Sequence, residues 1–305
     1  MVRCYNSRVI GGLPKLSLNR NGLQKSAEAQ GFSYIDGDTN PSISSSLERG
    51  GRELKRRTNR TAGEQVRLIS SIFEVRSKSS NSDEAIARSY DQEYGGEKPK
   101  YGYVSALLSP EGFDLITGIP KDKINQLRVL DVGAGSNEFL RFCRDELAIP
   151  ANQLSGSDVS GESTKIIEND GFSAHQGRIE TLDLPERSFD LVYLSYFIDY
   201  DTDQAATFGA AIDRVPSGGK IVLEGWFPVR PFGLLEKDRR DYSFITKGKT
   251  AEEDIQLVRD AFQNIGKEKG RTVSLEKVVK THRFVHSQYG FCKLDSYFLT
   301  FSVND

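Results

Sequence analysis

A glycine-rich turn between a predicted strand and a predicted helix is the segment of this sequence best suited to hold a ligand. Residues 129–139 read VLDVGAGSNEF, so an apolar run ends in Gly133-Ala134-Gly135 and a helical pattern follows. Glycine has no Cβ and a helix N-terminus presents backbone N–H groups, so such a turn lets the main chain approach a ligand closely. Asp131, two positions before the first glycine, suits a ligand that carries positive charge.

Two common phosphate-binding turns do not fit this segment. The dinucleotide turn requires G-x-G-x-x-G, but the last position here is Glu138. The loop of phosphate-binding NTPases requires Gly-Lys-Ser/Thr, which the segment lacks. Asp131 would also repel a pyrophosphate. The alternatives that remain are a turn that holds a cationic ligand and a turn that holds none.

Four segments in order resemble the class I S-adenosylmethionine-dependent methyltransferases, over about residues 100–226. They are VLDVGAGSNEF (129–139), SGSDVS (155–160), QGRIETLDLPERSFDLVYLSYFIDY (176–200) and RVPSGGKIVLEGW (214–226). The first motif of this family is an acidic residue followed by G-x-G-x-G. Asp131, Gly133 and Gly135 match that motif, and Asn137 replaces the third glycine. Asparagine tolerates a positive φ better than most residues do.

The resemblance implies that S-adenosyl-L-methionine is the cofactor. Asp158 corresponds to the family's carboxylate for the ribose hydroxyls; a helix cap is the alternative role for an aspartate at a strand end. Arg178 stands where many members have an acidic residue for the adenine amine, and the N–H of Ile179 could donate to the ring. The expected cofactor-binding residues are Asp131, Gly133, Ala134, Gly135, Asn137, Asp158, Val159, Arg178, Ile179, Glu180, Ser195 and Tyr90.

Candidate residues for the methyl acceptor follow the last two parallel strands, because ligands of open α/β sheets bind beyond the carboxyl ends of the strands. Glu224 and Asp201 lie in these regions, and residues 227–250 have the aromatic and basic composition of a lid. A solvated loop is the alternative for 227–250. The expected substrate-binding residues are Tyr94, Asp199, Trp226, Arg230 and Tyr242.

Three residues are candidates for catalysis. His282 and His286 are four positions apart in a predicted strand, which puts them on the same face. Either could act as general base for an O–H or N–H acceptor, and a role at the sheet edge is the alternative. Tyr196, which follows Ser195, would flank the methionine part of the cofactor. Tyr90 or Tyr94 would cover the cofactor, since aromatic rings attract cations; the alternative is packing of N-terminal helices.

Strand and helix signals alternate from Gln126 onward, which predicts a largely parallel sheet. Strands are expected at 127–132, 153–159, 172–176, 189–197 and 220–226, and helices at 137–147, 161–170, 203–215 and 250–267. Runs 273–286 and 296–303 are expected to form an antiparallel pair at the sheet edge. With the resemblance, the predicted fold is α/β: a seven-stranded, mostly parallel, doubly wound Rossmann-like methyltransferase sheet with that edge pair and an N-terminal helical cap.

The chain divides into three regions by composition. Residues 1–60 form a polar, basic extension, in which 39–51 (TNPSISSSLERGG) have the composition of a linker. Residues 61–125 form the cap, with helices expected at 64–75 and 81–95. Residues 126–305 form the cofactor-binding domain, which includes the insertion 227–250.

The overall composition excludes several classes of protein. Apolar residues make up 37% and charged residues 28% of the chain, so a sizeable core can form. No apolar run approaches the ~20 residues of a membrane span, and the N-terminal sequence lacks a signal-peptide pattern, which predicts a cytoplasmic location. Three scattered cysteines argue against a disulfide scaffold and a zinc site, so no metal is expected.

The charge distribution argues against a nucleic-acid partner. Residues 1–80 carry 14 Lys and Arg against 7 Asp and Glu, whereas the remaining residues carry 27 against 36. The acidic body would repel a polyanion.

The leading hypothesis is transfer of a methyl group from S-adenosylmethionine to oxygen or nitrogen of a small molecule, driven mainly by positioning. The alternatives are aminocarboxypropyl transfer or cyclisation, an RNA methyltransferase guided by residues 49–60, and a binding module without activity.

Overall fold

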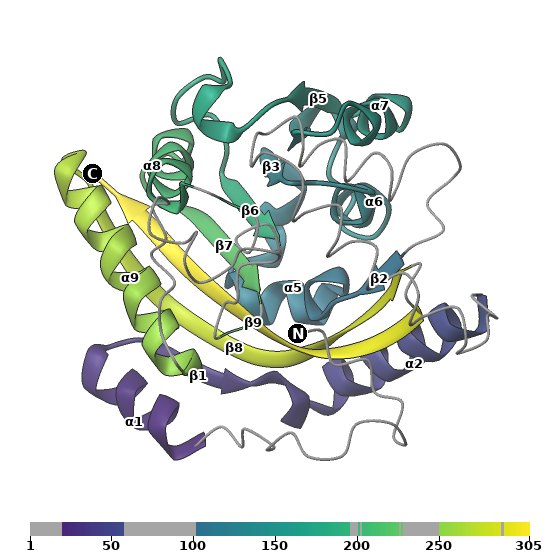
Figure 1. Ribbon diagram of the computed structural model, residues 1–305, viewed down its shortest axis with the longest axis horizontal. Coiled ribbons are helices and arrows are strands. Elements are labelled where there is room, and N and C mark those ends of the chain that lie inside the picture. Colours follow the sequence, from purple (N-terminus) through teal and green to yellow (C-terminus); the bar gives the residue numbers. More distant parts are fainter. Residues whose placement is uncertain are drawn as a thin grey trace, which may run out of the picture.

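A mixed nine-stranded sheet with helices on both faces organises the residues that the structure describes (Figure 1). The computed structural model describes residues 20–57, 102–195, 201, 203–225, 227, 250–287 and 290–305. The strands are β1 (Ser33–Asp36), β2 (Gly102–Val104), β3 (Val129–Val132), β4 (Leu154–Asp158), β5 (Ser173–Gln176), β6 (Leu191–Ser195), β7 (Gly219–Gly225), β8 (Thr272–Ser287) and β9 (Gly290–Asn304). The α-helices are α1 (Arg20–Gln30), α2 (Pro41–Arg57), α5 (Pro110–Thr117), α6 (Glu138–Asp145), α7 (Gly161–Asn169), α8 (Gln204–Arg214) and α9 (Ala251–Glu268).

Short 3-10 helices connect several of these elements. They are η1 (Gly37–Thr39), η3 (Ala106–Leu108), η4 (Lys121–Gln126), η5 (Ala151–Gln153) and η6 (Ile179–Thr181). Within the described ranges, no helix is long and apolar enough to cross a membrane. The same residues contain no group of three or more His, Cys, Asp or Glu side chains that could hold a metal ion.

The predicted α/β fold class is confirmed. Strands β3 to β7 are parallel and lie in the order β5-β4-β3-β6-β7, with a helix after β3, β4, β6 and β7. Each predicted parallel strand exists, with ends that differ from the expected ones by a few residues. Asp131 of β3 pairs with Gly156 of β4 and Tyr193 of β6, so the carboxyl ends of these strands meet at one edge of the sheet.

The predicted antiparallel C-terminal pair is also present. β8 and β9 pair from Thr272–Asn304 to Ser287–Gly290, and β9 pairs antiparallel with β7 as far as Gly225–Tyr297. The sheet has nine strands rather than seven because two strands from the N-terminal part of the chain join β8. β1 pairs parallel with its first half and β2 antiparallel with its second half. β1 therefore forms the edge of the sheet next to β8 and β9.

The linker expected at residues 39–51 is wrong, because this segment begins helix α2. Asn40 caps the helix: its Oδ1 accepts hydrogen bonds from Ser42 N at 3.1 Å and Ile43 N at 3.3 Å. Ile43 and Leu47 are 1% and 2% exposed. Two apolar residues four positions apart, with serines between them, are only a weak indication of a helix. The sequence pattern alone therefore did not predict α2.

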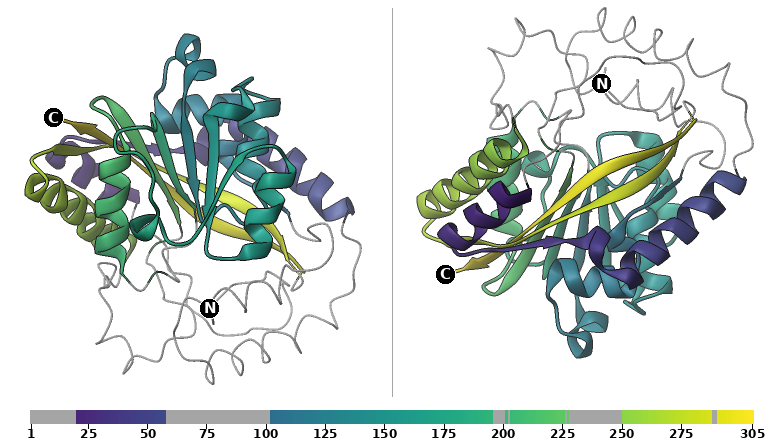
Figure 2. Two further views of the ribbon diagram at one scale, coloured as in Figure 1. Left: turned by 90° about the horizontal axis from the view of Figure 1, so that it is seen from above. Right: turned by 90° about the horizontal axis from the view of Figure 1, so that it is seen from below.

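Two buried clusters hold the helices on opposite faces of the sheet (Figure 2). Helices α8 and α9 pack on one face, where the ring of Phe262 stacks on Phe208 and Phe301, with centroids 4.3 Å apart in each pair. Helices α2, α5, α6 and α7 pack on the other face. The capping box predicted for α9 is confirmed, with Thr250 and Glu253 bonded reciprocally. The helices expected at 64–75 and 81–95 lie outside the described residues.

The contact between α5 and η3 yields a first prediction. A Cβ at Gly112 would lie 1.7 Å from the carbonyl oxygen of Ala106 and 2.8 Å from Oγ of Ser109. We expect Gly112→Ala to lower the free energy of unfolding by about 2 kcal/mol, because the backbone of η3 must move to admit the methyl group. Urea denaturation followed by circular dichroism measures this change.

Gly161→Ala is the matched control, since Gly161 also lies in the first turn of a short helix. A Cβ there would meet only the side chain of Gln176, at 3.3 Å. Alanine favours a helix over glycine by about 1 kcal/mol, so this variant should be as stable as the wild type or more stable. Equal denaturation midpoints for the two variants would contradict the close packing of α5 on η3.

Candidate functional site

Polar residues gather at the carboxyl edge of the parallel strands. Asp131 is 2% exposed and lies in the strand just before the glycine turn. Asp158 is 7% exposed and ends the neighbouring strand β4. Ser195, which is half-buried, ends β6 on the other side of β3. The sheet thus brings together these three residues that the sequence predicted for cofactor binding.

The glycine turn bends sharply back toward β4. The N–H groups of Gly133 and Ala134 both donate to the carbonyl oxygen of Ser157, at 2.8 and 3.0 Å. Gly133, Gly135 and Asn137 have φ values of 71°, 52° and 56°. Asparagine therefore adopts the left-handed conformation at the position where the family has its third glycine, so the departure at Asn137 preserves the path of the chain.

Asp158 ties the turn to the second strand. Its Oδ2 accepts a hydrogen bond from Gly135 N at 2.9 Å, and its Oδ1 accepts one from Ser160 N at 2.8 Å. The N-cap of α7 is Ser160, whose Oγ accepts from Ser163 N at 3.1 Å. Because Ser160 caps α7, the geometry does not support the alternative that Asp158 is the helix cap.

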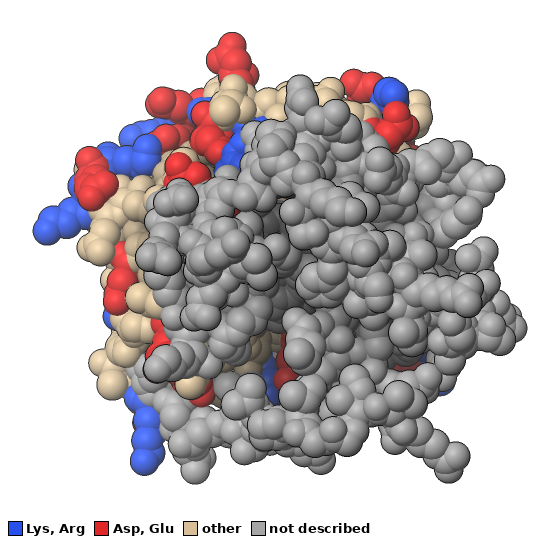
Figure 3. All heavy atoms as spheres, in the orientation of Figure 1, with Lys and Arg blue, Asp and Glu red and all other residues tan. Residues whose placement is uncertain are grey.

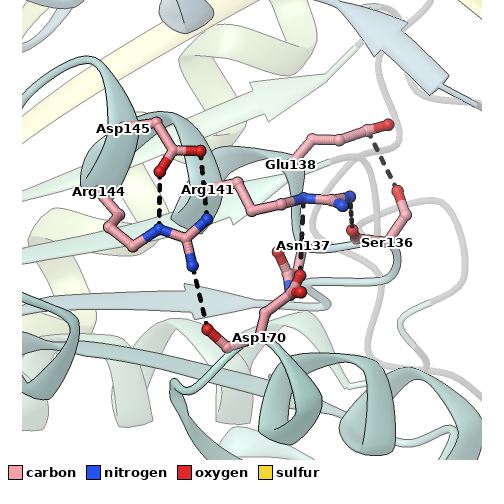
Figure 4. A network of polar contacts seen from close by, with 7 residues as sticks. All are labelled: Ser136, Asn137, Glu138, Arg141, Arg144, Asp145 and Asp170. Carbon is pink, nitrogen blue, oxygen red and sulfur yellow. Dashed lines mark hydrogen bonds and ion pairs between the residues drawn. The ribbon is translucent and has the colours of Figure 1, made fainter.

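A polar network holds the far side of the turn (Figure 4). Asn137 is fully buried, and its Nδ2 donates to Oδ2 of Asp170 at 3.0 Å. Arg141 contacts both sides of this network. Its Nε lies 3.7 Å from Oδ2 of Asp170, and its Nη2 donates to the carbonyl oxygen of Ser136 at 2.6 Å. Arg144 donates to the main chain of Asp170 at 3.1 Å. The turn is thereby fastened to the end of α7.

Sequence reasoning missed Asp170 and Arg141. The available signal was Asn137 itself, since a buried amide in place of glycine requires a polar partner. Its partner Asp170 lies 33 residues along the chain, at the end of α7, so only the folded structure brings the two together.

A charged group of three residues joins the segment after β5 to Asp201, which lies between β6 and α8. The guanidinium of Arg178 donates to the carboxylate of Glu180 and, through Nη2 at 2.6 Å, to Oδ1 of Asp201. Burial raises the pKa of the Asp201 carboxyl above its usual range, and the charge of Arg178 opposes this shift. The side chain of Ile179 packs in the core at 1% exposure. Arg178 is thus directed at two carboxylates. Cofactor binding by Arg178 stays a prediction, as it does for Ile179, Glu180 and the half-buried Val159.

Glu224, at the end of β7, is enclosed rather than open to a substrate. Its side chain is fully buried. Oε1 accepts hydrogen bonds from Ser105 Oγ at 3.0 Å and Ser296 Oγ at 2.9 Å, and Oε2 accepts one from the hydroxyl of Tyr193. This enclosed environment does not support the expectation that Glu224 contacts the methyl acceptor.

The predicted catalytic histidines lie on β8, outside β7 and β9 in the sheet. His282 is 2% exposed, with Nδ1 2.7 Å from Oδ1 of Asp38 and Nε2 3.7 Å from Oε1 of Glu48. Both carboxylates belong to the N-terminal segment. His286 is opposite Gly102 in the register with β2. General-base catalysis by either histidine stays a prediction.

Seven of the predicted site residues lie outside the described part of the chain. They are Tyr90, Tyr94, Tyr196, Asp199, Trp226, Arg230 and Tyr242.

The described edge fits a positively charged nucleoside derivative. Two buried carboxylates, Asp131 and Asp158, flank the turn, and negative charge favours a sulfonium. A Cβ at Gly135 would meet only the carbonyl oxygen of Gly133, at 3.9 Å, so its glycine serves the positive φ rather than a crowded protein contact. Carboxylate oxygens can each accept more than one hydrogen bond, which suits Asp158 for a pair of ribose hydroxyls.

Two of the solved structures that the chain matches are methyltransferases of low sequence identity. An S-adenosylmethionine-dependent methyltransferase from Mesorhizobium loti is 17% identical, with a TM-score of 0.44 over 65% of this chain and 98% of that chain. The N-methyltransferase NodS from Bradyrhizobium japonicum, solved with S-adenosyl-L-homocysteine, is 14% identical, with a TM-score of 0.42 over 72% of this chain and 98% of that chain. No curated protein matches the sequence.

A family model described as a methyltransferase domain matches residues 84–263. This range contains the glycine turn, Asp158 and the five parallel strands β3 to β7. Because the match spans more than half of the 305 residues, the chain belongs to the S-adenosylmethionine-dependent methyltransferases of Rossmann-like fold, and S-adenosyl-L-methionine is its cofactor.

Proposed function

We propose that this methyltransferase transfers the methyl group of S-adenosylmethionine to an oxygen or nitrogen atom of a small molecule. The observation that carries the proposal is the buried Asp158, whose carboxylate is bonded to Gly135 of the turn and Ser160 of the next helix. That arrangement supports a nucleoside site at the edge of the sheet from which the last two parallel strands lead to the acceptor.

The protein's part in the reaction is mainly to position and to select charge. When bound, the cofactor supplies an electrophilic methyl group on a positively charged sulfonium. Asp158 would hold the ribose, the turn at Gly133 and Gly135 would let the main chain approach, and Asp131 would supply negative charge nearby. Correct placement of two reacting groups can account for ~7–11 kcal/mol of a barrier, so positioning is the main contribution that we infer for the protein.

A small acceptor is favoured by the charge of the chain outside residues 1–80. The chain outside residues 1–80 has an excess of acidic side chains. On the face in Figure 3, the described acidic and basic side chains are intermixed and make no continuous basic stripe. A phosphate backbone needs several basic contacts for affinity. These observations support a small molecule over RNA.

Cofactor binding provides the first test of this function. We expect the wild type to bind S-adenosylhomocysteine, and Asp158→Asn to bind it at least about tenfold more weakly, since hydrogen bonds to a charged group contribute about 1.5–3 kcal/mol. Isothermal titration calorimetry on the folded proteins measures both affinities.

Asp190→Asn is the matched control for that measurement. Asp190 lies just before β6, at the opposite end from the site, and binds Arg128 through two hydrogen bonds of 3.1 Å. Its variant loses an ion pair but should keep the wild-type affinity. Absence of heat with the wild type would end the cofactor assignment, and equal affinity for Asp158→Asn would remove Asp158 from the site.

The turn conformation provides a second test. Asn137→Ala loses the bond to Asp170 and forces alanine to a φ of 56°. We expect a loss of about 2 kcal/mol in unfolding free energy, because the left-handed conformation costs roughly 1–2 kcal/mol for an L-residue and a hydrogen bond contributes about 1 kcal/mol. Asn137→Gly loses only the bond and should be clearly more stable than the alanine variant. Equal unfolding free energies would show that the backbone conformation has no energetic role.

The reaction type is tested by its product. With a panel of small amines and hydroxyl compounds, we expect S-adenosylhomocysteine and a methylated acceptor by mass spectrometry. Aminocarboxypropyl transfer or cyclisation would instead release methylthioadenosine, which keeps the methyl group. A parallel incubation with total RNA should leave the RNA unmethylated; methylated RNA with strong salt dependence would favour the alternative substrate class.

A further inference from the structure

The buried carboxyl group of Glu224 lies where three separate parts of the fold meet. Ser105 begins η3, Tyr193 belongs to β6, and Ser296 belongs to β9 just beyond the end of its pairing with β7. All three residues are 1% exposed or less, and each donates its hydroxyl to Glu224. Burying an acidic group is costly unless it is well hydrogen-bonded, so this group needs an account beyond packing.

The first connection from Glu224 to the cofactor turn runs through Tyr193. The tyrosine ring packs on Phe139, with ring centroids 4.4 Å apart. Phe139 is the second residue of α6 and follows the turn directly. The hydrogen bond from the Tyr193 hydroxyl therefore fixes the ring against which the first turn of α6 rests.

The second connection runs through Ser105. Its hydroxyl donates to Glu224 and accepts from Leu107 N at 3.3 Å, so the carboxyl group orients the cap of η3. Leu107 is fully buried in the same cluster as Phe139 and Ala134, the central residue of the turn. Both connections thus lead from Glu224 into the buried cluster that contains Ala134 of the turn.

We propose that Glu224 is a positioning residue that holds the cofactor turn in its binding geometry through Tyr193 and Ser105. The inference rests on the proposed function in taking residues 133–137 as the cofactor site. A carboxylate offers two acceptor oxygens and no donor, which suits three converging hydroxyls. Glutamine has one acceptor oxygen and an NH2 group, so it must leave at least one of these hydrogen bonds rearranged.

The test uses the full chain and S-adenosylhomocysteine as the probe, with surface plasmon resonance to follow association and dissociation. For Glu224→Gln we expect dissociation about tenfold faster, as for the loss of one hydrogen bond to a charged group, with an association rate within about a factor of three of the wild type, since interface changes act mainly on dissociation. The stoichiometry of the folded protein should stay unchanged. Tyr193→Phe and Ser105→Ala should show the same change to a smaller degree.

Tyr297→Phe is the matched control. Tyr297 is a fully buried tyrosine of β9, and its hydroxyl has no hydrogen-bond partner among the described residues. Tyr297→Phe takes the same hydroxyl group from the core as Tyr193→Phe does but breaks no hydrogen bond to Glu224, so the dissociation rate should equal that of the wild type.

The outcomes separate the two proposals. If the wild type does not bind the probe, the proposed function fails and this inference falls with it. If the wild type binds and Glu224→Gln dissociates at the same rate, only the inference is overturned. A lower bound fraction with an unchanged dissociation rate would mean a merely structural residue and would also overturn it. Should Glu224→Gln not fold, Tyr193→Phe compared with Tyr297→Phe decides: faster dissociation of the first alone supports the proposal, and equal rates refute it.

Discussion

The hydrogen bonds that Asp158 accepts from Gly135 and Ser160 are the constraint on which the site depends. They join the turn after β3 to the start of α7, so the ligand-facing main chain is fixed before any ligand arrives. The left-handed conformation of Asn137 and its bond to Asp170 complete the same arrangement from behind. A preformed turn limits the conformational entropy that binding must remove.

The carboxylates near this edge connect parts of the chain that are distant in sequence. Asp158 accepts hydrogen bonds from two backbone N–H groups, which join the end of β4 to the turn after β3. Glu224 accepts hydrogen bonds from hydroxyl groups of η3, β6 and β9. Arg178 forms ion pairs with Glu180 and with Asp201, which follows β6. The same residues that give this end of the sheet its polar character therefore also hold its elements together.

The features that could be predicted from the sequence are those that depend on residues close together in the chain. The parallel strands, the turn at Gly133 and the capping box at Thr250 could be predicted because apolar runs, glycines and cap residues act over a few positions. Helix α2 could not, since Ile43 and Leu47 become a helix face only when β8 is there to cover them. The enclosure of Glu224 depends on Ser105, 119 residues away, and no local pattern reports such a contact. The same holds for the pair of Asn137 and Asp170.

The attachment of the N-terminal segment to β8 has a consequence for biosynthesis. Asp38 contacts His282, which lies 244 positions later in the sequence. Among the described elements, β1 pairs only with β8. A ribosome adding ~5–20 residues per second needs roughly 10–50 s to span that interval. For that time Ile43 and Leu47 emerge without their final neighbours, so the nascent chain exposes an amphipathic helix that chaperones can bind. The N-terminal segment can therefore complete its packing only after β8 has been synthesised.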